Sequence, residues 1–178
     1  SVLPRETPAT VQEAAKTIDL GQAPTPEGAE IAQQNIAVLS YQAKEKVADA
    51  FARHQKHLKS LGFKQEQGEM VSEQYASAAF SKSKFRISLT ITPSGPDLVL
   101  VTLNNLGNIR PSEIPLLPGG KTVYSGPDTA IFTVEQGVDD ARTALKEHLK
   151  KLGWTPYGDA DPISIFKQNG IRLVAMVT

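Results

Sequence analysis

The sequence contains an internal repeat. When the chain is aligned with itself at an offset of 91 residues, segment 47–63 matches segment 138–154 at eight of seventeen positions. Average residue usage gives about one identity in such a window by chance. The repeat therefore predicts two copies of one unit, each of about 90 residues. The identical pairs are Val47 and Val138, Asp49 and Asp140, Ala50 and Ala141, His57 and His148, Leu58 and Leu149, Lys59 and Lys150, Leu61 and Leu152, and Gly62 and Gly153.

Each copy begins with the pattern of a strand followed by a helix. Residues 36–41 and 129–134 are short apolar runs typical of buried strands. Residues 44–61 then carry apolar side chains at steps of three and four, and the second copy repeats this spacing. This periodicity predicts an amphipathic helix in each copy, with one face buried.

Each predicted helix is followed by a glycine and an aromatic residue, Gly62 with Phe63 and Gly153 with Trp154. A glycine just past a helix end readily takes the left-handed conformation, and the next residue then packs back on the last turn. We therefore interpret these matched residues as helix ends and not as a ligand site.

The helix is followed by an antiparallel meander. Segments 75–82 and 85–92 form a hairpin candidate, and the dipeptide Asn169-Gly170 marks the matching turn of the second copy. In the first copy a turn at 93–96 leads to a further apolar strand, 98–103, which has no counterpart in the second copy. Two explanations are open for the C-terminal edge that results. Strand 98–103 serves both units, or a partner chain, such as a second copy, pairs with the edge.

We therefore predict an α+β fold made by internal duplication of a β-α-β-β(-β) unit. Each antiparallel sheet is expected to be covered by one helix, and the units are expected to be related by a pseudo-twofold axis. Residues 1–22 form an N-terminal extension with a short amphipathic helix over 10–20, residues 23–106 the first unit and residues 107–178 the second. The two units are expected to pack as one compact domain.

The composition restricts the classes of partner. The chain has 19 basic and 19 acidic residues, so its formal net charge is zero and no basic surface for nucleic acid is expected. No apolar run approaches the roughly 20 residues that span a bilayer. Because there are no cysteines, the chain has no disulfide, thiolate metal site or cysteine nucleophile.

Four residues matched between the copies are candidates for ligand binding: Arg86, Arg172, His57 and His148. Two arginines facing a groove between the units would hold a carboxylate or phosphate in bidentate fashion. The competing interpretation is structural. The arginines would pair with acidic residues of the chain, and the histidines would occupy the last helical turn, where positive charge suits the helix dipole.

No metal site, cofactor or catalytic residue is predicted. His54 and His57 have a spacing that suits a metal, but the second copy has Leu145 in place of His54. Asp159 and Asp161 are interpreted as part of a polar turn rather than a calcium loop. The established nucleophile and phosphate-binding motifs do not occur in the sequence.

These observations favour a non-catalytic binding or structural module with an unidentified ligand or protein partner. The alternative is an anion-binding sensor or enzyme with its site in the cleft between the units. The topology of the unit resembles that of small exported bacterial α+β modules. Together with the polar, proline-containing start at Ser1, it favours a periplasmic or extracellular protein whose signal has been removed, with the cytoplasm as the alternative.

Overall fold

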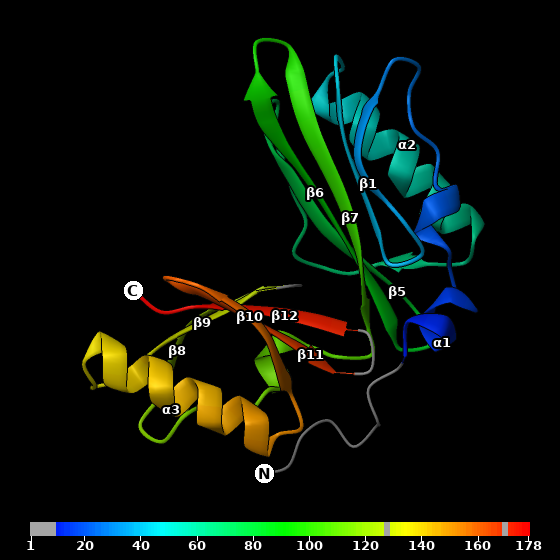
Figure 1. Cartoon of the computed structure of the whole chain (residues 1–178). Helices are drawn as coiled ribbons and strands as arrows, with labels where there is room; N and C mark the ends of the chain where they lie inside the picture. The colour runs from blue at the N-terminus through cyan, green and yellow to red at the C-terminus, as the bar shows by residue number, and fades with distance from the viewer. Residues whose placement is uncertain (1–9, 127–128, 169–170) are drawn as a thin grey trace. The chain divides into compact units, whose positions relative to one another are not determined.

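The computed structural model describes residues 10–126, 129–168 and 171–178. The chain is a mixed α+β protein with mostly antiparallel sheets, and its described part has three α-helices (Figure 1). The chain divides into two compact units between Asn108 and Ile109. We call them the N-terminal unit, Val11–Asn108, and the C-terminal unit, Ile109–Thr178. No helix in the described part of the chain is both long and apolar enough to cross a membrane.

The N-terminal unit is a seven-stranded antiparallel sheet with helix α2 on one face. Its strands follow the order β1-β2-β7-β6-β5-β3, and β4 also pairs with β5. The elements are α1 (Val11–Ala15), the 3-10 turn η1 (Leu20–Gln22), β1 (Glu30–Gln34), β2 (Val38–Ala43), α2 (Val47–Ser60), β3 (Lys64–Gln65), β4 (Met70–Val71), β5 (Ala76–Lys82), β6 (Phe85–Gly95) and β7 (Leu98–Gly107).

The core of this unit lies between α2 and the sheet. The apolar stripe of α2, with Phe51 and Leu58, is buried against Ile87, Leu89 and other residues of the sheet's inner face. Ile87, Leu89 and Ile91 of β6 are buried toward this core, and Arg86 and Ser88 between them are also buried, which the alternating sequence does not predict. The predicted helix 44–61 and the predicted hairpin are therefore confirmed.

Both helix ends have the predicted geometry. Gly62 and Gly153 have φ angles of 89° and 91°. The backbone N–H of Phe63 donates to the carbonyl of Leu58 at 3.0 Å, and that of Trp154 donates to Leu149 at the same distance. These hydrogen bonds are those of a Schellman ending. Helix termination therefore explains why the leucine and glycine residues at the two helix ends are identical in the matched segments.

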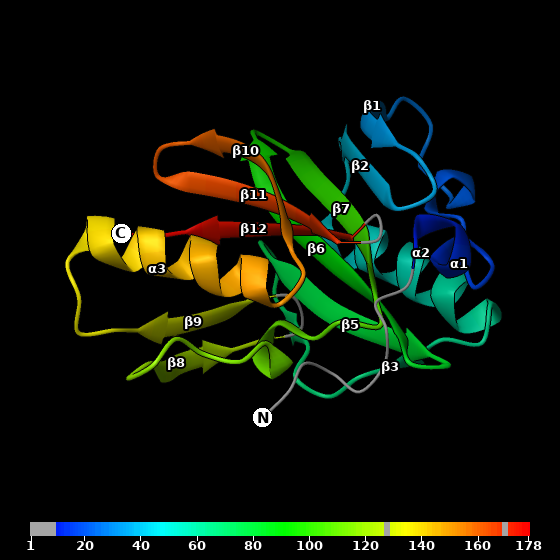
Figure 2. The same cartoon turned by 60° about the horizontal axis from the view of Figure 1, so that its bottom comes forward.

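The C-terminal unit has a hairpin, a helix and a three-stranded meander in this chain order (Figure 2). Its small buried core joins Leu149 of the helix to Ile109, Trp154 and Phe166. The elements are the 3-10 turn η2 (Pro111–Glu113), β8 (Lys121–Ser125), β9 (Ala130–Thr133), α3 (Val138–Lys151), β10 (Thr155–Ala160), β11 (Ile163–Gln168) and β12 (Ile171–Met176).

Several elements differ from the sequence-based prediction. Strands β1, β8 and β10 were not predicted, because all of their residues are exposed and their sequences lack the alternation that burial imposes. The predicted helix 10–20 forms only as α1 and is followed by η1, where the Asp19 side chain accepts from the N–H of Gly21. The turn predicted at 93–96 lies later in the chain, at Pro96-Asp97, because β6 continues to Gly95. The turn Asn169-Gly170 lies outside the described residues.

Strand β7 pairs along its length with β2 on one side and β6 on the other, all within the N-terminal unit. A strand has only two hydrogen-bonding edges, so β7 has none left for the C-terminal unit. The interpretation that this strand serves both units is therefore wrong.

The turn between β5 and β6 leads to a stability prediction. Its two central residues, Ser83 and Lys84, have φ angles of 49° and 71°, which are unfavourable for residues with a Cβ. We expect the double substitution Ser83→Asn and Lys84→Gly, the residues of the matching turn, to stabilise the N-terminal unit by about 1 kcal/mol. Urea unfolding followed by circular dichroism measures the change.

The control for this turn variant is Ser83→Ala with Lys84→Ala, which keeps both Cβ atoms and should give no gain in stability. Trp154 is the only tryptophan of the chain and is buried in the C-terminal unit. Its fluorescence therefore reports that unit separately and should keep its unfolding midpoint. Equal stability of the Asn-Gly variant and the alanine control would contradict the proposed backbone strain.

Candidate functional site

The two matched histidines, His57 and His148, lie in the last turns of α2 and α3. The Nε2 of His148 is hydrogen-bonded to the carbonyl oxygen of Pro115, a residue of the same unit. His57 is half-buried, and burial lowers the pKa of its imidazole. Both side chains therefore lie in the helical layer of their own unit.

His54 belongs to a buried polar network beneath α2. Its Nε2 lies 2.8 Å from the hydroxyl of Tyr41, which also accepts a hydrogen bond from Arg53 at 3.2 Å. Arg53 in turn donates two hydrogen bonds to the carboxylate of Glu45, at 2.6 and 3.0 Å. The network connects the helix to the end of β2 through charges that are paired within it.

Burial sets the protonation of this network. Desolvation, followed by the charges of Arg53 and His57, lowers the pKa of His54 to about 3. Desolvation and the nearby Glu45 carboxylate raise the pKa of the Tyr41 hydroxyl well above its usual range. Because Tyr41 and His54 are fully buried, neither side chain reaches a molecule in solution, and their role is structural. Within the described ranges, no group of three His, Asp or Glu side chains could hold a metal ion.

Arg86 forms an ion pair on the sheet face opposite α2. Its Nε and Nη2 donate to the two carboxylate oxygens of Glu66 at 3.0 and 2.6 Å. The side chain is almost completely buried. This bidentate geometry is the one an external carboxylate would use, and a residue of the chain already occupies it.

Arg172 lies in different surroundings, although it matches Arg86 in sequence. It is an exposed residue of β12, directly opposite Lys167 of β11. No acidic partner of either side chain occurs among the residues that the structure describes. Two like charges directly opposite each other disfavour the sheet, so a bound carboxylate would relieve a repulsion here.

Within each unit, the candidate arginine and histidine face opposite sides of the sheet. Strand neighbours point to alternate faces. Leu173, next to Arg172, packs on the core beneath α3, so Arg172 points away from the helix that carries His148. Arg86 likewise points away from α2 and His57. Neither unit by itself brings its arginine and its histidine together.

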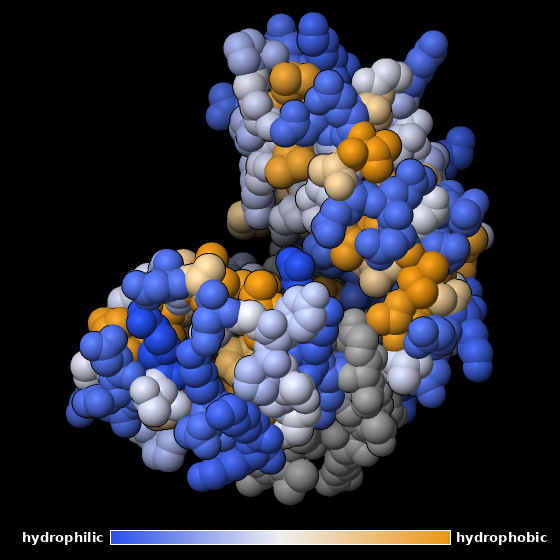
Figure 3. All heavy atoms as spheres, in the orientation of Figure 1, coloured by the Kyte–Doolittle hydropathy of each residue, from blue (hydrophilic) through white to orange (hydrophobic). Residues whose placement is uncertain are grey.

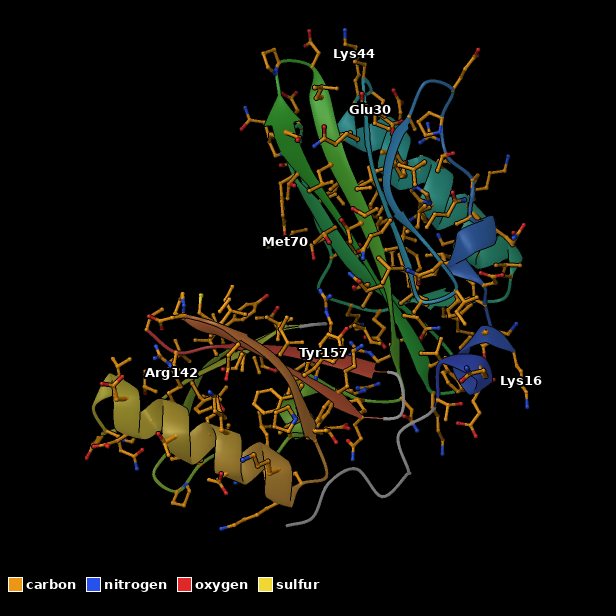
Figure 4. The ribbon with its side chains drawn as sticks, in the orientation of Figure 1. Lys16, Glu30, Lys44, Met70, Arg142 and Tyr157 are labelled. Carbon is orange, nitrogen blue, oxygen red and sulfur yellow. The ribbon has the colours of Figure 1, made fainter. Side chains whose placement is uncertain are left out.

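The sheet face around Arg172 is apolar and exposed. Ile163 lies opposite Met176, and Ile165 lies opposite Val174, all on the face away from α3. Tyr157 joins this face, because the Lys167 ammonium lies 3.5 Å from the centre of its ring (Figure 4). Val174 and Met176 are 50% and 64% exposed. We define the open face as Tyr157, Ile163, Ile165, Val174 and Met176, bordered by Lys167 and Arg172.

The matched positions of the N-terminal unit carry hydroxyls. At the offset of 86, Ser77, Ser88 and Thr90 correspond to Ile163, Val174 and Met176. Figure 3 shows hydrophobic side chains at the surface of the C-terminal strands. Comparing the non-core positions of the two copies could have identified the open face, but sequence reasoning considered only the matched charged residues and missed it.

The two aspartates of the predicted polar turn are held by basic residues of α3. Asp159 accepts from Lys146 at 2.7 Å and from the Ser164 hydroxyl at 2.6 Å, and these bonds lower its pKa. Asp161 pairs with Arg142 at 2.7 Å. Asp159 lies in strand β10 and not in a loop. Both carboxylates therefore attach the meander to α3.

The depressed pKa of His54 predicts a pH-dependent stability. Between pH 6.5 and about 3, the unfolded chain binds a proton at this position that the folded chain does not bind. Stability should therefore fall as the pH is lowered through this range, by up to about 1.4 kcal/mol per pH unit for one group. We expect His54→Leu, which places the residue of the matched position 145, to reduce this slope.

Urea unfolding at pH 7, 6 and 5 tests the contribution of His54. The slope of stability against pH should be smaller in the variant than in the wild type. His57 and the carboxylates are present in both proteins, so their contributions to the slope cancel in the comparison. Identical slopes would show that His54 is not the group that takes up the proton on unfolding.

Comparisons with models of protein families, with curated proteins and with solved structures find no match for this chain. Its function is therefore argued from the side chains described above.

Proposed function

We propose that this protein is a duplicated, non-catalytic binding module that holds a protein partner on the open face of its C-terminal sheet. The supporting observation is that three matched positions carry hydroxyls in the N-terminal unit, where Ser88 is almost completely buried, and large exposed apolar side chains in the C-terminal unit. Ser77, Ser88 and Thr90 occupy these positions in the N-terminal unit, and Ile163, Val174 and Met176 occupy them in the C-terminal unit. An exposed group of apolar side chains on a sheet marks an interaction surface.

The duplication itself supports this proposal. The eight identities in seventeen positions, the two Schellman endings and the shared order of hairpin, helix and meander agree with two copies of one ancestral unit. After a duplication, the residues of one copy that lie outside the shared core can change, and such positions in the C-terminal unit carry exposed apolar side chains. The pseudo-twofold relation of the copies stays a prediction.

The charges that border the open face indicate the chemistry of the partner. Lys167 and Arg172 lie at one end of the apolar side chains. A partner segment with apolar residues next to a carboxylate would cover the apolar side chains and also receive the bidentate hydrogen bonds of Arg172. The apolar side chains are exposed and not recessed, which suits the broad contact of a protein better than an enclosed small molecule.

A random peptide library displayed on phage tests the binding face. We expect the full chain to enrich peptides that combine acidic and apolar residues. The double substitution Val174→Ser and Met176→Thr, which introduces the residues of the N-terminal unit, should weaken their binding at least about tenfold, because two apolar contacts are lost. Fluorescence titration with the enriched peptides measures the affinity.

The chain offers a matched control for the binding experiment. Val71→Ser with Met70→Thr removes the same two side-chain types from exposed positions of the N-terminal unit, where Val71 and Met70 are 49% and 58% exposed (Figure 4). This variant should bind the peptides as the wild type does. If the peptides bind the open-face variant as tightly as the wild type, the proposed binding face is wrong.

A further inference from the structure

Strand β7 connects the first hairpin and the meander of the N-terminal unit. It lies antiparallel to β2 of the first hairpin and antiparallel to β6 of the meander. Through β7 the hairpin and the meander become one continuous sheet. Its inner residues, including Val101 and Leu103, complete the core that α2 covers.

The C-terminal unit has a hairpin, a helix and a meander as the N-terminal unit does, but its described residues include no strand in the place of β7. Hairpin β8-β9 and meander β10-β11-β12 form two separate sheets (Figure 2). Among the described residues, β9 pairs with β8 alone and β12 pairs with β11 alone. Strands β9 and β12 correspond to β2 and β6, the two neighbours of β7. Each therefore has one edge without a described partner strand, and such unpaired edges favour the addition of a strand.

Burial on the inner side of the C-terminal unit supports a missing strand. Val47 and Val138 are the same residue at the first position of matched helices of equal length. Val47 is 3% exposed, as part of the core that β7 completes, whereas Val138 is 45% exposed. The difference in exposure between Val47 and Val138 is explained if the sheet that packs against α3 lacks a strand.

We propose that an extended strand of a partner protein inserts between β12 and β9, antiparallel to both, in the place that β7 has in the N-terminal unit. This inference rests on the proposed binding function and names the form of the partner segment. Main-chain hydrogen bonds to two open edges would provide affinity, and alternate side chains would enter the core beneath α3.

The register of β7 indicates one side chain of the incoming strand. Leu103 lies between Leu39 of β2 and Leu89 of β6. The matched positions in the C-terminal unit are Ala130 and Ala175. In a closely packed core, the total volume of three neighbouring side chains on adjacent strands is expected to be similar in the two units. Two alanines in place of two leucines therefore leave room for a residue larger than leucine between them. The incoming strand is therefore expected to carry an aromatic side chain at this position.

A synthetic peptide with the sequence of residues 98–107 tests the inference in the full chain. The peptide carries Leu103→Phe, and a lysine at each end keeps it soluble. Hydrogen exchange measured by mass spectrometry should slow at least about tenfold in both β12 and β9 when the peptide is added, because their edge N–H groups become paired. A peptide with Leu103→Ala should protect these strands less.

A peptide with the same side chains, but with N-methyl groups along one edge, is the matched control. It cannot pair with strands on both sides and should give no protection of β9 and β12 together. Equal protection by the methylated peptide would overturn the inference, since side chains alone would then explain binding. Protection confined to β2 and β6 would also overturn it, because the peptide would be replacing β7.

Two further outcomes separate this inference from the proposed function. If analytical ultracentrifugation shows a dimer whose β12 is already protected without peptide, a second copy fills the edge and the inference is wrong. If the phage-selected peptides depend on Val174 and Met176 but the β7 peptide protects neither edge, the inserted strand is wrong while the binding function remains. If the β7 peptide protects both edges but no phage-selected peptide depends on Val174 and Met176, the open face is not the binding face and the inserted strand remains.

Discussion

The backbone pairing of β7 on both of its edges is the interaction on which the N-terminal unit depends. Each strand presents N–H and C=O groups along two edges, and those away from water need partners. By pairing with β2 and β6, strand β7 converts a hairpin and a meander into one sheet. The single sheet then offers α2 a continuous apolar face, and this allows Leu58 and Phe51 to be buried together with Leu103.

The C-terminal unit shows what the same elements do without that pairing. Its hairpin and meander remain separate sheets, and its core is smaller. Residues of the same type differ accordingly: Val47 is buried and Val138 is exposed, and Arg86 is paired with Glu66 while Arg172 is exposed beside Lys167. Sequence identity between matched positions therefore does not imply an equal environment, because burial depends on what packs on each position.

Much of the local structure was predictable from the sequence. Helices α2 and α3, their glycine endings and the hairpin of β5 and β6 follow from rules that act within a few residues, as at Gly62 and Gly153. Strands β1, β8 and β10 were not predictable, because exposed strands carry no pattern of burial. Of the candidate site, only Arg172 was found from the matched charges. Tyr157 and Met176 became significant when strand pairing placed them on one exposed face.

The sequence by itself determined the matched segments 47–63 and 138–154 and the two long helices with their ends, because these follow from residue types and spacing. The tertiary structure decided which matched residues are paired, buried or exposed. Glu66 reaches Arg86 from twenty residues away, and Ile163 meets Met176 across two strands. Such contacts join positions that no local pattern connects, so only the folded chain distinguishes a structural arginine from an exposed one.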